Sequence, residues 1–458
     1  MRVLLVDPPK PKWWLLADTV LPPIGLAYLA GYLRSRGIEV RVLDCTAEGV
    51  DWEGLRREVE RYSPDILGAG GPTCYAERVA RTFRIAKEVE EGITTVAGGP
   101  HFTLTYEESL KKCPEIDYIV LGEGEVTLYE LVEALESGCK VSRVKGIAFR
   151  RGREVVATEP RELIGDLDSL PMPAWDMLPM DRYRMVAWGD ATMLVSSRGC
   201  PFSCSFCSER VFWRGVWRAH SAERVVAEME LVAERYGKRV IWFGDDTFNL
   251  DRERLEKICE LLLERGVEVN WGFEGRADLL WRDRDLMPKM REAGLFWVLV
   301  GVESCFEDEL ERYGKRISPE LTMRVFRLLR ESDIVSQAML IIGEKHDDRR
   351  RILDKADFAV KLDPDFAVFT PLTPFPGTPL YDEALREGLI EVFDYSKYDL
   401  AHAVMRTEYL SAGEVQKLME ECYRRFYGRP LKLLRGVLSR NRFRRGVNAY
   451  FLRFIIGF

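Results

Sequence analysis

Short apolar runs alternate with amphipathic stretches along most of the chain. In the first part of the sequence, runs at 3–6, 40–43, 66–69, 95–97 and 118–121 have the length and composition of buried strands. The stretches between them, at 24–36, 52–62 and 77–90, have the apolar spacing of helices, and a last helix follows residue 121. Strands separated by helices of this length predict a Rossmann-like parallel sheet with helices on both faces.

The alternation stops at a Pro-rich stretch and then resumes. Residues 166–190 lack periodicity and predict an ordered linker. Strands are then predicted at 193–195, 239–243, 268–273, 296–300, 334–342 and 366–370, with helices at 222–236, 252–264, 283–293, 319–331 and 348–361. Six strand and helix units predict a partial parallel (β/α)6 barrel. We therefore expect an α/β protein with domains at 1–165 and 191–400 and a helical C-terminal region at 401–458.

Three thiols lie in the loop after the first barrel strand. Cys200, Cys204 and Cys207 have the spacing C-x-x-x-C-x-x-C. Thiolates hold iron-sulfur clusters, and three ligands on one loop can hold three corners of a [4Fe-4S] cube while the fourth iron stays open. A zinc knuckle or a set of buried structural thiols is the alternative. No fourth Cys or His lies at the spacing of a closed zinc site, so the pattern favours the cluster.

This spacing, followed by strand and helix alternation, resembles the radical S-adenosylmethionine (radical SAM) superfamily. The resemblance implies that the three Cys bind the cluster and that the open iron chelates SAM. It also implies that strand ends around the cluster contact SAM, and we expect these contacts from Phe206, Gly244, Asp245, Asp246, Arg276, Glu303 and Ser304.

Each of these strand-end residues has an ordinary alternative. The aspartates replace the family's usual Gly-Glu, and they also suit a turn before the helix that begins at Arg252. Arg276 can bind a carboxylate with its fork or form a surface ion pair. Glu303 ends an apolar run, where a buried carboxylate is costly without a partner, and this favours a site.

Glycines and polar residues mark the predicted strand ends of the first domain, where parallel sheets bind ligands. There is no G-x-G-x-x-G after the first strand, which disfavours a nicotinamide-type site. Placed directly before a radical SAM motif, this domain resembles the cobalamin-binding domain of B12-dependent radical SAM enzymes. The resemblance implies cobalamin contacts from Pro8, Trp13, Gly71, Thr73, Gly98, Gly99, Pro100, His101, Gly122 and Glu123.

The axial side of the cobalt departs from many B12 proteins. The D-x-H-x-x-G signature that supplies an axial His is absent, and the corresponding loop holds Pro8 and Trp13. We therefore expect no His ligand from that loop. Trp13 suits either the lower corrin face or a core. His101 is a minor candidate ligand, and a hydrogen-bonded structural His is the commoner alternative.

Composition sets the broad class. The chain has 458 residues, 47% of them hydrophobic and 31% charged, with a net charge of −7. These values are typical of a folded soluble protein and give no general argument for nucleic acid as a partner. The ten Cys are otherwise scattered, as in a reducing compartment, and neither a signal peptide nor an apolar run of 18 residues is present. We expect a cytoplasmic protein.

The last residues change in character. From Gly428 onward, Arg and Lys are interleaved with Leu and Phe at helical spacing. A helix packed on the barrel with a solvated Arg face would give this pattern, as would an interfacial helix attracted to anionic lipid. RNA binding is the third alternative, since Arg also neutralises phosphates.

The resemblance implies a mechanism. An external donor of flavodoxin or ferredoxin type reduces the cluster, and SAM then yields a 5'-deoxyadenosyl radical that abstracts hydrogen from an unactivated carbon under anaerobic conditions. Methylcobalamin delivers a methyl group to a small-molecule or lipid-like substrate in a dry cavity expected between the two sheet edges. Two alternatives stay open: cobalamin-dependent cyclisation or rearrangement without methyl transfer, as in the anaerobic porphyrin-ring cyclase, and a cluster-bearing electron-transfer or sensor protein.

Overall fold

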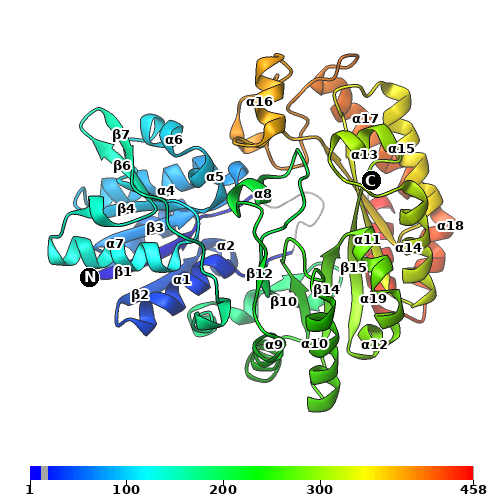
Figure 1. Ribbon diagram of the computed structural model, residues 1–458, viewed down its shortest axis with the longest axis horizontal. Coiled ribbons are helices and arrows are strands. Elements are labelled where there is room, and N and C mark those ends of the chain that lie inside the picture. Colours follow the sequence, from blue (N-terminus) through cyan, green and yellow to red (C-terminus); the bar gives the residue numbers. More distant parts are fainter. Residues whose placement is uncertain (12–18, 457–458) are drawn as a thin grey trace. The chain divides into compact units, whose positions relative to one another are not determined.

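The computed structural model describes residues 1–11 and 19–456, and it divides into two compact units (Figure 1). The first unit is Met1–Tyr183 and the second is Arg184–Phe458. Trp13, assigned above to the cobalamin site, lies outside the described residues.

A seven-stranded sheet forms the first unit, in the order β2-β1-β3-β4-β5-β6-β7. The first five strands are parallel, as the sequence pattern predicts, and two antiparallel strands extend the sheet beyond β5. The chain leaves β1 toward β2 and then crosses back to β3, so the direction of winding changes between β1 and β3. Open α/β sheets bind ligands at such a switch point. The strands are β1 (Arg2–Asp7), β2 (Glu39–Asp44), β3 (Ile66–Gly70), β4 (Thr94–Gly98), β5 (Tyr118–Val120), β6 (Ile147–Arg151) and β7 (Glu154–Ala157).

Helices follow the strands of this sheet. They are α1 (Ile24–Ser35), α2 (Cys45–Glu48), α3 (Trp52–Tyr62), α4 (Ala76–Val89), α5 (Gly99–Leu104), α6 (Tyr106–Lys112) and α7 (Glu125–Ser137). The core between helices and sheet includes Leu4, Leu67 and Phe83, all fully buried. The short α5 and α6 follow β4, where the sequence pattern predicts no helix, because six and seven residues are too few to show a helical period.

The Pro-rich stretch after the sheet packs on the first unit as an ordered loop. Leu167 and Leu170 join Tyr28 and Tyr32 of α1 in a small buried cluster. Gly31 lets this loop approach the helix, because a Cβ there would lie 2.6 Å from a backbone oxygen of residue 172. The first unit thus continues through residue 183, whereas the sequence pattern predicts a linker over 166–190.

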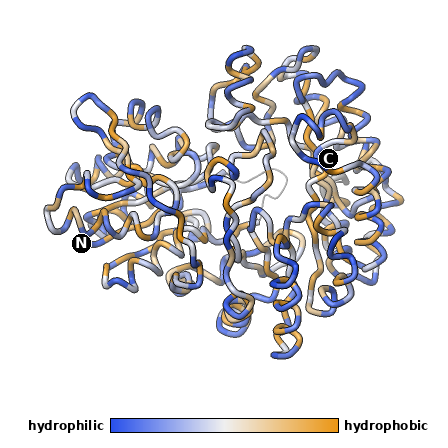
Figure 2. The backbone as a smooth tube through the Cα atoms, in the orientation of Figure 1, coloured by the Kyte–Doolittle hydropathy of each residue, from blue (hydrophilic) through white to orange (hydrophobic). Residues whose placement is uncertain are grey.

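Six parallel strands form the sheet of the second unit, in the order β10-β13-β14-β15-β16-β17. This order follows the chain, as in a partial barrel, and it confirms the fold class. Its strands are rich in hydrophobic residues, as Figure 2 shows, and Trp271, Phe273 and Phe296 are fully buried there. The strands are β10 (Thr192–Leu194), β13 (Val240–Phe243), β14 (Asn270–Gly275), β15 (Leu295–Glu303), β16 (Val335–Ile342) and β17 (Phe366–Pro371).

The helices between these strands cover the outside of the sheet (Figure 1). They are α9 (Ala222–Tyr236), α10 (Arg252–Arg265), α11 (Ala277–Arg282), α12 (Met287–Glu292), α13 (Glu307–Arg312), α14 (Pro319–Glu331) and α15 (Arg349–Leu362). Helices α16 (Pro379–Arg386), α17 (Ala412–Tyr427), α18 (Pro430–Val437) and α19 (Arg442–Ile456) follow the last strand.

Two tyrosines of α17 cap the free edge of β17. The Tyr427 hydroxyl accepts from the backbone N–H of Ala367 and donates to the carbonyl of the same residue, at 3.2 and 2.9 Å. The Tyr423 hydroxyl makes the same pair of bonds with Phe369, both at 3.2 Å. An edge strand otherwise presents unpaired backbone groups to other chains, so these side chains protect the edge of an open barrel.

The last helix covers the amino ends of the barrel strands. Phe443 of α19 packs on Phe296 at the start of β15, with ring centroids 4.0 Å apart. Arg444 pairs with Asp333 and Asp365, which precede β16 and β17. The opposite, carboxyl ends of the strands are therefore the ends left for a site. Among the described residues no helix is long and apolar enough to span a bilayer.

Candidate functional site

The three thiols lie on one irregular loop of the second unit. The loop connects β11 (Ser197–Arg198) with α8 (Ser208–Phe212), and β11 pairs with β12 (Arg218–Ala219). Cys200, Cys204 and Cys207 are half-buried and form no disulfide. Burial raises the pKa of Cys207 to about 12, and iron would hold the sulfur as thiolate despite this. Three accessible thiols on one loop, without a fourth ligand from the same loop, fit an iron-sulfur cluster with an open corner.

Contacts on both sides hold this loop. Gly199 has φ +89°, and a Cβ there would lie 2.1 Å from the carbonyl oxygen of Val216, so only glycine fits. The backbone N–H of Ser205 donates to the carbonyl of Tyr313 at 3.0 Å. Phe206 packs edge-on against the Tyr313 ring, with centroids 5.1 Å apart. Phe206 therefore has a packing role in addition to the SAM contact predicted for it.

The two aspartates after β13 have different surroundings. Asp245 is buried, and its carboxylate accepts from the backbone N–H of Ser196 and from the hydroxyls of Ser196 and Ser197, at 2.5–2.7 Å. Asp246 is half-buried and accepts from the backbone N–H of Gly199 at 3.0 Å. Asp245 thus links the chain after β13 to the start of the Cys loop. The carboxylate of Asp246 can still accept hydrogen bonds from a ligand. Gly244, just before them, is exposed.

Arg276 follows β14 and lies against the Cys loop. Its guanidinium forms a two-point ion pair with Asp278, with both N···O distances 3.1 Å. The same group lies over the ring of Phe202, 3.6 Å from its centroid. Arg276 therefore forms an ion pair, which was the alternative to a ligand contact. The pair joins half-buried groups and does not lie on the open surface.

A glutamate with a strained backbone ends β15. Glu303 has φ +60°, an uncommon conformation for a residue with a side chain, at a register shift between β15 and β16. Its carboxylate forms a 2.5 Å ion pair with the buried Lys315. Gly301 leaves room for this pair, since a Cβ there would lie 2.6 Å from both Glu303 Oε1 and Lys315 Nζ. Ser304 is buried and its hydroxyl accepts from the backbone N–H of Phe306.

Lys315 is a residue that the sequence analysis missed. It is buried, and its charge lowers the pKa of Cys204, against the larger effect of burial, which raises it. Arg276 acts on Cys204 in the same direction as Lys315. Lys315 lies between two helices in an unremarkable polar stretch, so nothing in the pattern marks it.

Two carboxyls at the strand ends are held partly protonated. Burial, and next the charge of Glu209, raise the pKa of Asp246 to about 8. Desolvation by the surrounding chain, and next the charge of Glu303, raise the pKa of Glu274 at the end of β14 to about 7, although solvent still reaches its side chain. Carboxyls crowded in this way favour a positively charged ligand. SAM carries an ammonium and a sulfonium, so its charge fits these residues.

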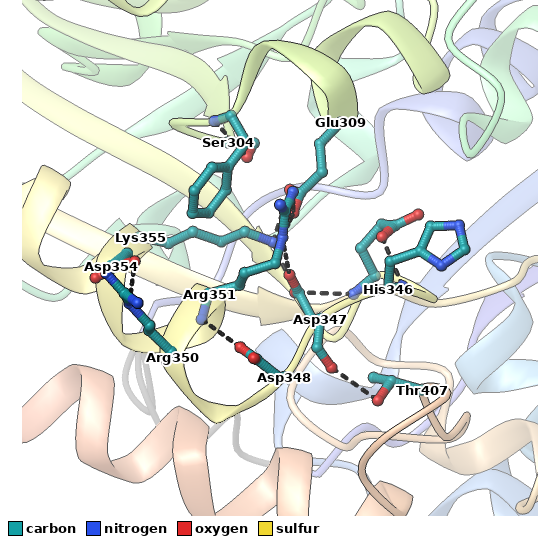
Figure 3. A network of polar contacts seen from close by, with 12 residues as sticks. Ser304, Glu309, His346, Asp347, Asp348, Arg350, Arg351, Asp354, Lys355 and Thr407 are labelled. Atoms are coloured by element: carbon teal, nitrogen blue, oxygen red, sulfur yellow. Dashed lines mark hydrogen bonds and ion pairs between the residues drawn. The ribbon is translucent and has the colours of Figure 1, made fainter.

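A buried ion network supports the loop after β16 (Figure 3). Lys355 of α15 is fully buried and pairs with Glu309 and Asp347 at 2.8 and 2.7 Å. Asp347 also accepts from the backbone N–H groups of Gly343 and Glu344. Oxygens of Glu309, Glu344 and Asp347 lie within 4.8 Å of one another, as in a metal site, but Lys355 already neutralises two of them. The network is therefore structural and fixes the strand end.

The glycines at the strand ends of the first unit pack against one another. A Cβ on Gly70 would lie 2.3 Å from the carbonyl oxygen of Gly98, and a Cβ on Gly99 would lie 3.0 Å from the nitrogen of Gly71. The loops after β3 and β4 approach closely only because these positions lack side chains. Gly122 has φ +76° and open space around it, and its N–H donates to Thr103. Pro100 begins α5, and the Pro8 carbonyl accepts from Thr46.

The polar residues predicted for cobalamin are largely buried. His101 Nδ1 lies 3.3 Å from the Thr73 hydroxyl, and burial lowers the His101 pKa to about 4, so the ring is neutral at pH 7. Glu123 accepts from the backbone N–H of Ile164 at 2.8 Å. These bonds fix the loops after β3, β4 and β5 at one edge of the sheet. Their roles toward cobalamin stay predictions.

A charged group at the β1 end escaped the sequence analysis. Lys10 pairs with Asp7 at 2.6 Å and lies over the Tyr75 ring, 5.2 Å from its centroid. Burial is the main cause that raises the pKa of Asp7 to about 6. Asp7 ends β1 and Tyr75 follows β3, so this group lies at the switch point of the sheet. The strand ends of the first unit are thus more polar than their glycines and prolines alone suggest.

Comparison with known proteins identifies the families of the two units. Residues 16–132 match the family model "B12 binding domain", and residues 194–356 match the model "Radical SAM superfamily". An uncharacterized methyltransferase of Pyrococcus horikoshii is 33% identical over 446 residues, which are 97% of this chain and 96% of that protein. The anaerobic magnesium-protoporphyrin IX monomethyl ester cyclase of Rubrivivax gelatinosus is 33% identical over 93% of this chain and 77% of its own length.

A solved structure has the same fold over most of the chain. The radical SAM methyltransferase TsrM of Kitasatospora setae, with cobalamin and a [4Fe-4S] cluster bound, superposes with a TM-score of 0.73 at 20% identity, covering 93% of this chain and 89% of TsrM. The matched domains assign cobalamin to the first unit, and SAM with a [4Fe-4S] cluster to the second. The chain therefore belongs to the radical SAM enzymes that carry a B12-binding domain.

Proposed function

We propose that this enzyme methylates an unactivated carbon of a small molecule. One observation carries the proposal: a cysteine loop that leaves one iron open follows a B12-binding domain on the same chain. The name of the Pyrococcus horikoshii relative, an uncharacterized methyltransferase, supports methyl transfer. When bound, SAM at the cluster would supply a radical for hydrogen abstraction, and cobalamin would supply the methyl group.

The residues around the Cys loop suit the binding of a cationic cofactor. Cys200, Cys204 and Cys207 would hold the cluster. Asp246 and Glu274 would accept the positive groups of SAM, because burial and neighbouring carboxylates make both acids favour a cation. Gly244 and Phe206 would line the same edge, with Ser304 near its end.

Positively charged residues and buried hydrogen bonds fix the strand ends around the Cys loop. Lys315, paired with Glu303, would offset the negative charge of the thiolates, as would Arg276. Asp245 orients the start of the Cys loop through Ser196 and Ser197. Residues whose own positions are fixed in this way hold a reacting centre with little reorganisation.

In the first unit, the loops after β1, β3, β4 and β5 would hold cobalamin. Pro8, Gly71 and Thr73 lie on the loops that flank the switch point. The remaining proposed contacts lie on the loops after β4 and β5: Gly98, Gly99, Pro100, His101, Gly122 and Glu123. His101 is neutral and already bonded to Thr73, which makes it a support for the loop rather than a cobalt ligand.

We also propose an external electron donor of flavodoxin or ferredoxin type and turnover under anaerobic conditions. Outside Cys200–Cys207 the other seven cysteines lie singly along the sequence, which is not the spacing of a second cluster motif. A second candidate function is cyclisation or rearrangement without methyl transfer, since the Rubrivivax gelatinosus cyclase is as similar to this chain as the methyltransferase relative is.

Anaerobic turnover with SAM labelled in its methyl group separates these functions. The reconstituted enzyme, a reductant and an extract of small molecules and lipids are incubated, and label is followed by mass spectrometry. Label in an extracted acceptor supports methylation. Deoxyadenosine formed with the extract but without labelled acceptor supports cyclisation or rearrangement and contradicts the proposal.

A matched pair of cysteine variants controls this experiment. Cys207→Ala removes a proposed cluster ligand, so iron content and deoxyadenosine formation should both fall to background. Cys305→Ala removes a thiol of the same barrel whose pKa burial raises to about 12. It should keep both signals. Equal loss in the two variants would show that the barrel, and not the cluster, had failed.

A further inference from the structure

The surface of α18 carries leucines where a soluble helix carries polar residues. Leu431, Leu434 and Leu438 are 71%, 50% and 74% exposed. They lie at positions i, i+3 and i+7, which share one face of a helix. Leu433 and Gly436 on the other side are buried. The helix therefore packs through one apolar side and presents a second apolar stripe outward, which we call the leucine stripe.

The packing of α18 fixes the direction of this stripe. Gly436 lies against α19, because a Cβ there would meet Asn448 at 2.1 Å. Lys432 Nζ pairs with Asp363 at 2.5 Å and anchors α18 to the turn between α15 and β17. The helix cannot turn its leucines inward without breaking both contacts.

The segment that carries the leucine stripe is positively charged. Residues 422–458 contain ten Lys and Arg and no Asp or Glu, so the net charge of −7 divides into +10 here and −17 over the rest of the chain. Four of the ten pair with acids of the barrel: Arg425, Arg429, Lys432 and Arg444. The other six are exposed and make no ion pair with an acid in the described parts of the chain: Arg424, Arg435, Arg440, Arg442, Arg445 and Arg453.

We propose that α18 and the arginines around it attach this protein to an anionic lipid bilayer. Exposed leucines on one helix face and unpaired arginines beside them are what an interfacial helix presents to acyl chains and to lipid phosphates. A nucleic acid would use the arginines but would gain nothing from three leucines, since it is bound through stacking on aromatic side chains. Phe443 and Phe451, the neighbouring aromatics, are buried in the barrel base.

The attachment surface lies away from the reactive end of the barrel. Lys432 contacts the turn that precedes β17, at the amino end of that strand. The Cys loop, Asp246 and Glu274 lie at the carboxyl ends of the barrel strands. The bilayer thus contacts the base of the barrel. The attachment places the enzyme on a membrane, and it gives no reason by itself to expect a lipid substrate.

Flotation of the full-length, cofactor-loaded protein with vesicles tests the proposal. Binding is expected to phosphatidylcholine vesicles that contain about 30% phosphatidylglycerol and to be absent with phosphatidylcholine alone. Raising the salt from about 0.1 to about 0.5 M should weaken it at least severalfold. The variant Leu431→Ser/Leu434→Ser/Leu438→Ser should bind at least about tenfold more weakly, since burial of three leucines is lost. Arg435→Gln/Arg440→Gln should also weaken binding.

Matched substitutions outside the surface serve as controls. Leu263→Ser/Met323→Ser changes exposed apolar residues of α10 and α14, and Arg327→Gln/Arg350→Gln removes two exposed charges. Both should bind as the parent does, and circular dichroism should show all variants folded. Absence of vesicle binding, binding that the leucine variant retains, or equal binding to neutral vesicles overturns the proposal. Binding of a single-stranded RNA oligonucleotide that displaces the vesicles and ignores the leucines also overturns it, in favour of nucleic acid.

Discussion

At the scale of single residues, adjacent side chains at the end of β13 have separate tasks. Asp245 is buried and accepts from three donors, whereas Asp246 accepts from the backbone N–H of Gly199 and remains half-buried. The difference follows from their neighbours, since Asp245 is buried against Ser196 and Ser197 and Asp246 lies beside Gly199. Alternation along β14 places Phe273 in the core and Glu274 on the exposed side.

Replacing the two aspartates should therefore affect different properties: stability for Asp245 and SAM affinity for Asp246. Asp245→Ala leaves three buried donors without an acceptor and should lower the free energy of unfolding by about 2–4 kcal/mol. Asp246→Ala should change stability by less than about 1 kcal/mol and weaken SAM binding at least about tenfold, because a charge-assisted bond is lost. Urea unfolding and calorimetric SAM titration measure the two effects. Loss of stability in Asp246→Ala without loss of SAM affinity would contradict the assignment.

The raised pKa values of Asp246 and Glu274 predict that stability falls and SAM affinity rises as the pH increases. The folded-state pKa values of Asp246 and Glu274, about 8 and about 7, exceed the ordinary values of 3.8 and 4.5. The folded protein thus binds more protons than the unfolded chain between about pH 4 and 8, and these groups make it less stable as pH rises through that window.

SAM affinity should rise over part of the same window, because its sulfonium stays positive and the carboxyls become charged. We expect roughly a tenfold gain between pH 6 and 8, measured by equilibrium dialysis. Asp246→Asn/Glu274→Gln should flatten the profile. A flat profile in the parent protein would mean that neither carboxyl contacts SAM.

At the scale of elements, helix α17 completes an open sheet. Its tyrosines, one turn apart, each satisfy a backbone N–H and a C=O of β17. The side chains reach the strand because residues i and i+4 share a helix face. Helix α17 thus satisfies backbone groups of β17 that a seventh strand would pair with in a longer sheet.

Removing these hydroxyls should loosen the edge. Tyr423→Phe/Tyr427→Phe keeps the rings but leaves four backbone groups unsatisfied, and we expect a loss of about 2–4 kcal/mol in unfolding free energy. Amide exchange of residues 366–371 should become faster. Tyr409→Phe, at an exposed tyrosine of the same unit, is the control and should change neither. Unchanged exchange at β17 in the double variant would show that the hydroxyls do not protect the edge.

At the scale of the whole molecule, two α/β units each present loops at the carboxyl ends of a parallel sheet. In both units the ends are fixed by buried polar contacts, Thr73 with His101 in the first and Lys355 with Asp347 in the second. Fixed strand ends suit large cofactors, because little conformational entropy is then lost on binding.

Cobalamin should protect a defined set of backbone amides. In hydrogen exchange of the full protein with and without hydroxocobalamin, slower exchange is expected at 8–11, 71–75, 99–104 and 121–124, on the loops after β1, β3, β4 and β5. The α18 segment serves as an internal control and should not change. Protection confined to other parts of the first unit would contradict the cobalamin contacts proposed here.

The sequence by itself determined the parallel strands of the two sheets, their order along the chain and the place of the three cysteines in the loop after the first barrel strand. These features are local: apolar runs, helical periods and short spacings are written in neighbouring residues. Tertiary structure decided what depends on residues far apart. It buried Lys315 beside Cys204, separated the roles of Asp245 and Asp246, and left three leucines of α18 facing outward. Burial and charge pairing arise between distant segments, so no local pattern contains them.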